Sequence, residues 1–574
     1  QAFLLAAIDE SEGPTYFRTV IDPGRVMGKV GLTASNAKYG EAAGIISSPR
    51  LYFEVTDTSD ARRAFDNYKR IMGTLYPPLP MPSWVKYQWL SWYVYYMDIN
   101  EDEIKRQIDY IAANLSDLGS WSVLVDAGWY VSEGREGSDW RNVDAAKFPS
   151  GLRALVDYAH AKGVKIVLYF SAPYLDSRKR EGDWLGLGSI IAKHPDWLIL
   201  LGEDESRQSF VYDFSNPELR QYMLDVLKDY FVKYDVDGIK VDGLGNAEGA
   251  TLSKEKLDTF GLVNSLAGQT MDIYRFIYEN GSQLKQDIYV ESGWQNPIFA
   301  SSYAHTFRYG DETNAFSNPY PQPGLLEHID YAALQKMALG QRPNMGAVNG
   351  DPNLSIVNQW WLEAGLALGT QVVLSFDLPS MSNEFLSDYR SLLMHYDAFA
   401  DETRFGGSLF PDSFATAVGD ITYLGVLNRG PDEKRVQLRL SDYGLDGDGP
   451  YSVYDVGLRR FTRSSGRIRA QMHGESFRLF VIRKSPGVMW TNSSVHDLKQ
   501  TASSLELTVK GPRSIQGFIN LHAPEPKAVF IDGRQLTLSE VHHAGRNTYW
   551  YDAQTSILTL RYNHERAHQI KVEY

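Results

Sequence analysis

From about residue 84 to about residue 400, short apolar runs alternate with segments of helical periodicity. This alternation is typical of βαβ units, in which helices cover a parallel sheet. Eight of the runs have the length of buried strands, and eight such strands with helices between them can close into a barrel. The sequence therefore predicts an α/β fold built on a (β/α)8 TIM barrel, with strands at Tyr87–Leu90, Val123–Asp126, Lys165–Phe170, Gly238–Asp242, Ile288–Glu291, His305–Arg308, Gly346–Asn349 and Gln371–Phe376.

Antiparallel β domains are expected on either side of the barrel. Residues 1–80 combine a few short strands with a helical segment, which indicates a partial N-terminal β region and a linker helix. The Pro-rich run 77–82 is a plausible boundary. After about residue 403 the helical period disappears, so we expect a catalytic barrel over 84–400, a β-sandwich domain over 403–484 and a second C-terminal β domain over 490–574. Bracing the barrel is the favoured role of these domains over sugar binding.

Composition excludes several classes of function. The formal net charge is −14 and basic residues do not cluster, which argues against nucleic acid as a partner. The chain has no Cys, so disulfides, iron–sulfur clusters and thiol nucleophiles are excluded. The His residues show no metal-ligand spacing and no apolar run has the ~18 residues of a membrane helix. We therefore expect no metal, no organic cofactor and no membrane span.

Polar residues end five of the proposed strands. A single acid at a strand end is adequately explained as a cap or turn residue, but strand ends of a barrel meet at one mouth, where catalytic residues lie. Two carboxylates facing each other across a small ring are what glycoside cleavage needs. The residues at these strand ends are Asp126, Lys240 with Asp242, Glu291 with Ser292, Arg308 with Asp311, and Asn349 with Asp351.

The surroundings of two acids differ. Lys240 stands two positions before Asp242 and favours its charged form, as a nucleophile requires. Asp311 is followed by Glu312, whose charge would raise its proton affinity, as an acid requires, whereas Arg308 acts in the opposite direction. These surroundings are compatible with a nucleophile at Asp242 and an acid at Asp311, but they do not decide which acid has which role.

Seven segments of the barrel region carry recognisable motifs: Leu124–Tyr130, Lys147–Leu152, Asp213–Glu218, Gly238–Asp242, Glu291–Pro297, Arg308–Glu312 and Val348–Leu354. In this order they resemble one enzyme family, the clan D α-galactosidases of glycoside hydrolase families 27 and 36. Arg308–Glu312 is similar to the acid/base motif of the branch with raffinose synthases and alkaline α-galactosidases.

The resemblance implies a retaining α-glycoside hydrolase that cleaves terminal α-linked sugars by double displacement, with an oligosaccharide or glycoconjugate as substrate. Asp242 would be the nucleophile and Asp311 the acid/base. Open alternatives are a transglycosylase like raffinose synthase, an α-glucosidase-type specificity and a non-catalytic carbohydrate-binding protein; a homo-oligomer is also left open. The implied substrate-binding residues are Asp126, Trp129, Lys240, Glu291, Ser292, Gly293, Trp294, Arg308 and Asp351.

The sequence departs from the family at three places. Ala127 replaces the second Asp of the family's Asp-Asp-Gly-Trp, a carboxylate that helps to identify galactose, so its loss can relax or change specificity. The third strand continues as Tyr169–Pro173, where family 36 enzymes often have Trp and Glu. The family 36 N-terminal super-sandwich is mostly missing, which indicates a smaller domain or a truncated chain.

Overall fold

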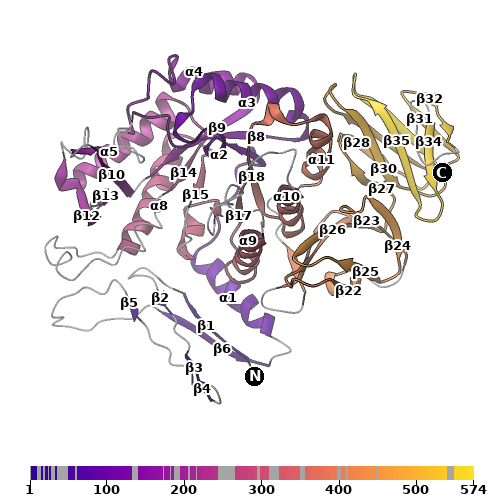
Figure 1. Ribbon diagram of the computed structural model, residues 1–574, viewed down its shortest axis with the longest axis horizontal. Helices are drawn as coiled ribbons and strands as arrows, with labels where there is room; N and C mark the ends of the chain where they lie inside the picture. The colour runs from indigo at the N-terminus through magenta and orange to yellow at the C-terminus, as the bar shows by residue number, and fades with distance from the viewer. Residues whose placement is uncertain are drawn as a thin grey trace.

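The computed structural model confirms the predicted barrel, because eight parallel strands close a ring in chain order (Figure 1). The eight are β7 (Tyr87–Leu90), β8 (Trp121–Val125), β9 (Val164–Phe170), β14 (Gly238–Val241), β15 (Tyr289–Ser292), β16 (Thr306–Arg308), β17 (Pro343–Asn349) and β18 (Gln371–Ser375). The structure describes residues 2–8, 15–16, 20–22, 25–27, 33–34, 50–57, 61–131, 140–171, 174–180, 183–185, 194–203, 207–214, 216–242, 266–293, 298–308, 322–349, 356–396, 402–406, 411–445, 449–539 and 548–574.

Helices surround these strands in the alternation that the sequence predicts. Asn216 caps one of them by accepting hydrogen bonds from the backbone N–H groups of Glu218 and Leu219, with Pro217 in the first turn. The helices of the barrel are the short α2 (Trp92–Tyr95), then α3 (Glu101–Asn114), α4 (Gly151–Ala161), α5 (Pro217–Lys228), α8 (Leu266–Leu284), α9 (Gln322–Leu334), α10 (Ile356–Leu368) and α11 (Asn383–Met394).

The barrel interior changes from apolar to polar along its axis. Six strands each contribute one residue to an apolar cluster: Leu90, Leu124, Val167, Tyr289, Ala347 and Val373. Alternate residues of a strand share a face, so the residue two positions later points the same way. Those later residues include Asp126, Tyr169, Glu291 and Ser375. The carboxyl ends of the strands therefore form a polar layer, and the apolar cluster fills the barrel interior below it.

An antiparallel sheet interrupts the barrel after β9. Its strand order is β11-β10-β13-β12, and Figure 1 shows it beside the barrel, at the end away from the C-terminal sheets. The strands are β10 (Tyr174–Arg180), β11 (Asp183–Leu185), β12 (Leu198–Glu203) and β13 (Arg207–Tyr212).

The N-terminal region packs on the outside of the barrel through helix α1 (Ala61–Leu75). Strands β1 (Ala2–Ala7) and β6 (Leu51–Thr56) form an antiparallel pair. Tyr68 and Met72 of α1 join this pair to Ala338 in one apolar cluster. Two further pairs are formed by β2 (Thr15–Tyr16) with β5 (Thr33–Ala34) and by β3 (Val20–Asp22) with β4 (Arg25–Met27).

Antiparallel sheets follow the barrel, as predicted. The first set is a six-stranded sheet, β19-β20-β21-β26-β23-β24, beside the pair β22-β25. Its strands are β19 (Thr403–Phe405), β20 (Ser413–Val418), β21 (Ile421–Asn428), β22 (Lys434–Arg439), β23 (Tyr451–Asp455), β24 (Arg460–Ser464), β25 (Arg467–Met472) and β26 (Ser476–Arg483).

The second set consists of two five-stranded sheets that enclose their own apolar core. One has the order β27-β30-β35-β34-β33 and the other β28-β29-β36-β31-β32. The strands are β27 (Gly487–Thr491), β28 (Ser494–Gln500), β29 (Ser504–Lys510), β30 (Gln516–His522), β31 (Ala528–Ile531), β32 (Arg534–Gln535), β33 (Thr537–Leu538), β34 (Thr548–Asp552), β35 (Ile557–Asn563) and β36 (His568–Glu573).

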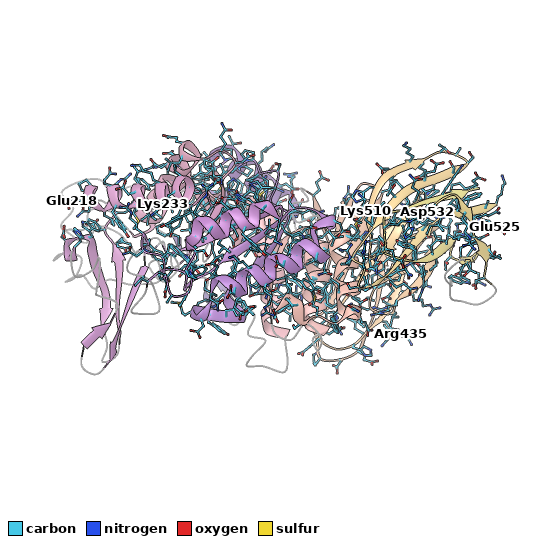
Figure 2. All side chains as sticks on the ribbon, turned by 90° about the horizontal axis from the view of Figure 1, so that it is seen from above. Glu218, Lys233, Arg435, Lys510, Glu525 and Asp532 are labelled. Carbon is cyan, nitrogen blue, oxygen red and sulfur yellow. The ribbon has the colours of Figure 1, made fainter. Side chains whose placement is uncertain are left out.

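Charged side chains of both signs lie at the two ends of the elongated molecule. Figure 2 shows Glu218 and Lys233 at the barrel end and Lys510, Asp532 and Glu525 around the C-terminal sheets. Among the described helices, none is long and apolar enough to cross a membrane.

Asp237 holds the start of β14 in place on the amino-terminal side of the barrel. Its carboxylate accepts hydrogen bonds from the backbone N–H of Ile166 (2.9 Å), from Lys165 (3.0 Å) and from Lys285 (3.1 Å), and it lies 2.7 Å from Nε2 of His160. Burial alone would raise its pKa, but His160, Lys285 and the Ile166 N–H together lower the pKa of Asp237 to about 2. This carboxylate therefore ties β9, β14 and the end of α8 together.

We expect the substitution Asp237→Asn to lower the free energy of unfolding by about 3 kcal/mol at pH 7, because it removes a buried carboxylate that binds the partly exposed Lys165, Lys285 and His160. A lowered carboxyl pKa contributes stability that is present above the ordinary pKa and is lost as pH falls toward 2. The difference between wild type and variant should therefore shrink between pH 4 and pH 2, as measured by urea unfolding.

Asp235→Asn is the matched control. Asp235 also binds Lys285, but its side chain is 36% exposed and its φ of +63° is one that Asn tolerates. Its loss should cost less than about 1 kcal/mol. Equal effects of the two substitutions would contradict the role assigned to Asp237.

Candidate active site

The centre of the barrel mouth is the side chain of Lys240 on β14. Its ammonium lies 2.9 Å from Oδ2 of Asp126, which follows β8, and 3.3 Å from Oδ2 of Asp242, which follows β14. The side chains of Lys240 and Asp126 are 2% and 3% exposed, whereas that of Asp242 is 21% exposed. The arrangement thus holds one accessible carboxylate against a buried cation, with a second carboxylate behind it.

Local sequence explains why Lys240 and Asp242 point into the barrel. They alternate with Ile239 and Val241, which are buried in the layer between strands and helices. A strand sends alternate residues to opposite faces, so a Lys and an Asp two positions apart share the inner one. Lys240 also lies over the ring of Tyr169 on the neighbouring strand β9, at 5.5 Å from the ring centre.

Asp126 is fixed by the backbone around it. Its own N–H donates to Oγ of Ser91 at 2.9 Å, and the N–H of Ala127 donates to its Oδ1 at 2.8 Å. Burial raises the pKa of Asp126, the charge of Lys240 opposes this rise, and the charge of Asp242 adds to it. Asp126 is therefore a buried acid whose ionisation depends on Lys240.

Gly293 lies directly against the Asp242 carboxylate. A Cβ at position 293 would stand 3.0 Å from Oδ1 of Asp242 and 2.9 Å from the carbonyl oxygen of Val241, closer than real contacts allow. Gly293 is not among the residues of positive φ, so the position needs space and not glycine's extra backbone freedom. Gly293 thus shapes the environment of Asp242 without offering a side chain to a ligand.

Glu291 and Arg308 complete the buried polar layer. Glu291 accepts a hydrogen bond from the Asn344 amide at 3.2 Å, and Nη2 of Arg308 donates to the hydroxyl of Tyr93 at 3.0 Å. Burial raises the pKa of Glu291, while the charges of Lys240 and Arg308 act in the opposite direction. The mouth therefore combines two cations with three carboxylates, Asp126, Asp242 and Glu291, which lie at the ends of β8, β14 and β15.

Two residues with an implied substrate-binding role lie elsewhere. Ser292 follows Glu291, so it faces the opposite side of β15, where its hydroxyl is hydrogen bonded to Tyr274 of α8. Trp129 is fully buried between Tyr130, Trp140 and Tyr230, and its Nε1 donates to the Tyr169 carbonyl. In this structure neither side chain is presented to the barrel mouth, and the substrate-binding roles expected for both stay predictions.

Asp311, Trp294 and Asp351 lie outside the described residues, so their expected roles stay predictions.

Helix α2 contributes residues that sequence reasoning missed. Besides the Ser91 contact to Asp126 and the Tyr93 contact to Arg308, Trp92 packs against the apolar cluster inside the barrel. The sequence does contain a signal for these residues, because an aromatic run directly follows the first barrel strand, at the carboxyl end of the barrel where functional loops lie.

In the part of the chain that the structure describes, no group of three or more His, Asp or Glu side chains could hold a metal ion.

Several known proteins are similar to parts of this chain. The Melibiase family model matches residues 88–292. The chain is 22% identical over 363 residues to the α-galactosidase Mel36A of Lactobacillus acidophilus, which covers 59% of this chain and 44% of that enzyme. It is also 27% identical over 131 residues to the 1,4-α-glucan branching enzyme GlgB of Corynebacterium efficiens, which covers 22% of this chain and 16% of that enzyme.

The matched regions span less than half the length of both relatives. Among solved structures, a family 27 β-L-arabinopyranosidase from Geobacillus stearothermophilus is similar with a TM-score of 0.52 and 14% identity, covering 72% of this chain and 98% of that one. That likeness supports the fold. The match to the Melibiase family model shows that residues 88–292, within the barrel, are similar to that family.

Proposed function

We propose that the protein is a retaining α-glycoside hydrolase of the α-galactosidase type, with Asp242 as nucleophile and Asp311 as acid/base. The observation that carries the proposal is the contact of the buried Lys240 with both Asp126 and Asp242 at the barrel mouth. A nucleophilic carboxylate must be charged and reachable, and Asp242 is the more exposed of the two partners of a fixed cation.

The proposed reaction has two displacements at the anomeric carbon. Asp242 attacks that carbon while Asp311 gives its proton to the departing glycosidic oxygen, which leaves a glycosyl ester on Asp242. Asp311 then takes a proton from a water molecule, whose oxygen attacks the same carbon and breaks the ester bond. Asp242 and Asp311 return to their starting forms, and the sugar is released with its original anomeric configuration.

The buried polar layer would bind the hydroxyl groups of the sugar. Arg308 and Lys240 offer donors, whereas Glu291 and Asp126 offer acceptors. These groups are held by Tyr93, Asn344 and the Ala127 N–H, so they are preorganised before substrate arrives. The resemblance to α-galactosidases favours galactose, whereas Ala127 removes one acceptor relative to the family motif and can change the specificity. We therefore propose galactose or a closely related sugar as the glycone.

The roles proposed for Asp242 and Asp311 can be tested by substitution. Asp242→Asn and Asp311→Asn should each lower kcat/KM by ~10³-fold or more, because one removes the covalent nucleophile and the other the proton donor. The measurement uses a panel of p-nitrophenyl α-glycosides: galactoside, glucoside, N-acetylgalactosaminide and xyloside.

Asp412→Asn, which changes a half-exposed acid before β20, should leave activity unchanged and serves as the control. Release of one sugar by wild type, lost in both variants, identifies the glycone. Wild-type activity in either variant would contradict the assigned roles, and no release from any of the four would favour a non-catalytic carbohydrate-binding protein.

The space beside the proposed nucleophile Asp242 is kept open by Gly293. Gly293→Ala should lower kcat/KM by ~10²-fold, because the added methyl group displaces the Asp242 carboxylate and small misplacements are costly in catalysis. Gly73→Ala in α1 is the matched control, since a Cβ there meets nothing within 4 Å. If Gly293→Ala kept the activity of wild type, the position of Asp242 would not matter in the way proposed.

A further inference from the structure

A polar cavity lies away from the barrel mouth, between α11 and the C-terminal sheets. Its volume is about 560 Å³, within the range of about 300–1,000 Å³ that small-molecule sites occupy. The lining comes from α11, from β23 and the turn after it, and from β27, β30 and β35. Figure 1 shows α11 beside these strands, on the side of the barrel that faces the C-terminal region.

The floor of the cavity is one face of the sheet β27-β30-β35. Trp490, Asn520 and Thr559 are paired across the three strands and form one row. Phe518 and Arg561 form the next row on the same face, because residues two positions apart share a face. The neighbouring residues Ile519 and Leu521 point the other way, into the core of the sandwich. This face is therefore a separate surface that the sandwich core does not use.

Aromatic rings give the cavity a rigid apolar wall. The ring of Trp490 is stacked on His395 with a centroid distance of 4.8 Å and an interplanar angle of 3°. Tyr454 lies 5.3 Å from Trp490 and is itself stacked on Phe461 at 4.4 Å. The aromatic wall is thus fixed from behind, so a ligand would not need to order these side chains.

An amide stands beside these rings on the cavity floor. Thr559 donates to Oδ1 of Asn520 at 2.8 Å, and Asn520 is 8% exposed. This bond fixes the orientation of the amide, whose nitrogen is a donor that suits a hydroxyl group of a ligand.

The charges around the cavity cancel. Arg459 and Arg561 are balanced by Glu384 and Asp388, and Arg459 donates to Asp388 at 2.6 Å. A site for a phosphate or another strong anion would have an excess of cations. Paired charges, amides and hydroxyls around aromatic rings instead suit a neutral ligand with many hydroxyl groups and an apolar face.

We infer that this cavity is a second carbohydrate-binding site, which holds a neutral saccharide with its ring against Phe518 and Trp490 and its hydroxyls on Asn520 and Asp388. The site would anchor the protein to a glycan that the barrel mouth does not hold. It does not depend on the proposed function, because none of its lining residues belongs to the barrel mouth described above.

The test uses the full chain with Asp242→Asn, to prevent digestion, in native gels that contain galactomannan, soluble starch or xyloglucan. At least one of these neutral polysaccharides should retard the protein. Adding Phe518→Ala with Asn520→Ala should raise the apparent Kd about tenfold or more, because it removes both a ring contact and the amide donor. Phe530→Ala, a half-buried aromatic on the opposite sheet, is the control and should change nothing.

The exposed Arg561→Ala supplies a second variant that leaves the core intact, with an expected rise in Kd of about threefold. Absence of retardation in all three gels, or equal retardation of the double variant, would overturn the inference. If dextran sulfate retarded the protein, and these variants lost that retardation, the inference would also be overturned, because the site would then bind an anionic ligand. Activity on p-nitrophenyl glycosides tests the barrel separately.

Discussion

The arrangement at the barrel mouth depends on one buried ammonium group. Lys240 has almost no exposed surface and its nearest charged partners are Asp126 and Asp242. Burial of the charged Lys240 and Asp126 is unfavourable unless the charges compensate one another, and removing the cation would leave the carboxylates of Asp126 and Asp242 without it. The positions of β8 and β14 are thereby coupled, and the accessible Asp242 is held where a ligand in the mouth can reach it.

Two further buried charged residues, Asp237 and Arg390, join separate parts of the chain. Asp237 fixes the amino-terminal end of β14, so the strand that carries Lys240 and Asp242 is held at both ends. On the opposite side, the fully buried Arg390 of α11 binds Asp117 and the carbonyl group of Asn492, which joins the barrel to the C-terminal sheets. The C-terminal region is therefore a fixed partner of α11, and the cavity between them has defined walls.

Periodicity and turn chemistry were sufficient to predict most of the fold. All eight barrel strands lie where the apolar runs place them, with ends that differ by a few residues. The Lys240–Asp242 pair could be predicted because the two residues belong to the same strand and share a face by parity. Strand parity would also have separated Ser292 from Glu291, since adjacent residues of a strand face opposite sides.

Other features required contacts that no local pattern encodes. Trp129 follows a strand end, as ligand-binding residues do, but its ring is enclosed by Tyr130, Trp140 and Tyr230, of which Tyr230 is distant in sequence. The closeness of Gly293 to Asp242 depends on how β14 and β15 are paired. The cavity at α11 is assembled from segments more than 100 residues apart in the chain, from Asn383 to Arg561.

The most direct test of the account is the anomeric configuration of the first sugar released, followed by ¹H NMR during hydrolysis of the best α-glycoside. Double displacement through Asp242 predicts that the α-anomer appears first and then mutarotates to the equilibrium mixture. Initial appearance of the β-anomer would mean a single displacement by water, and it would contradict the role of Asp242 as a covalent nucleophile.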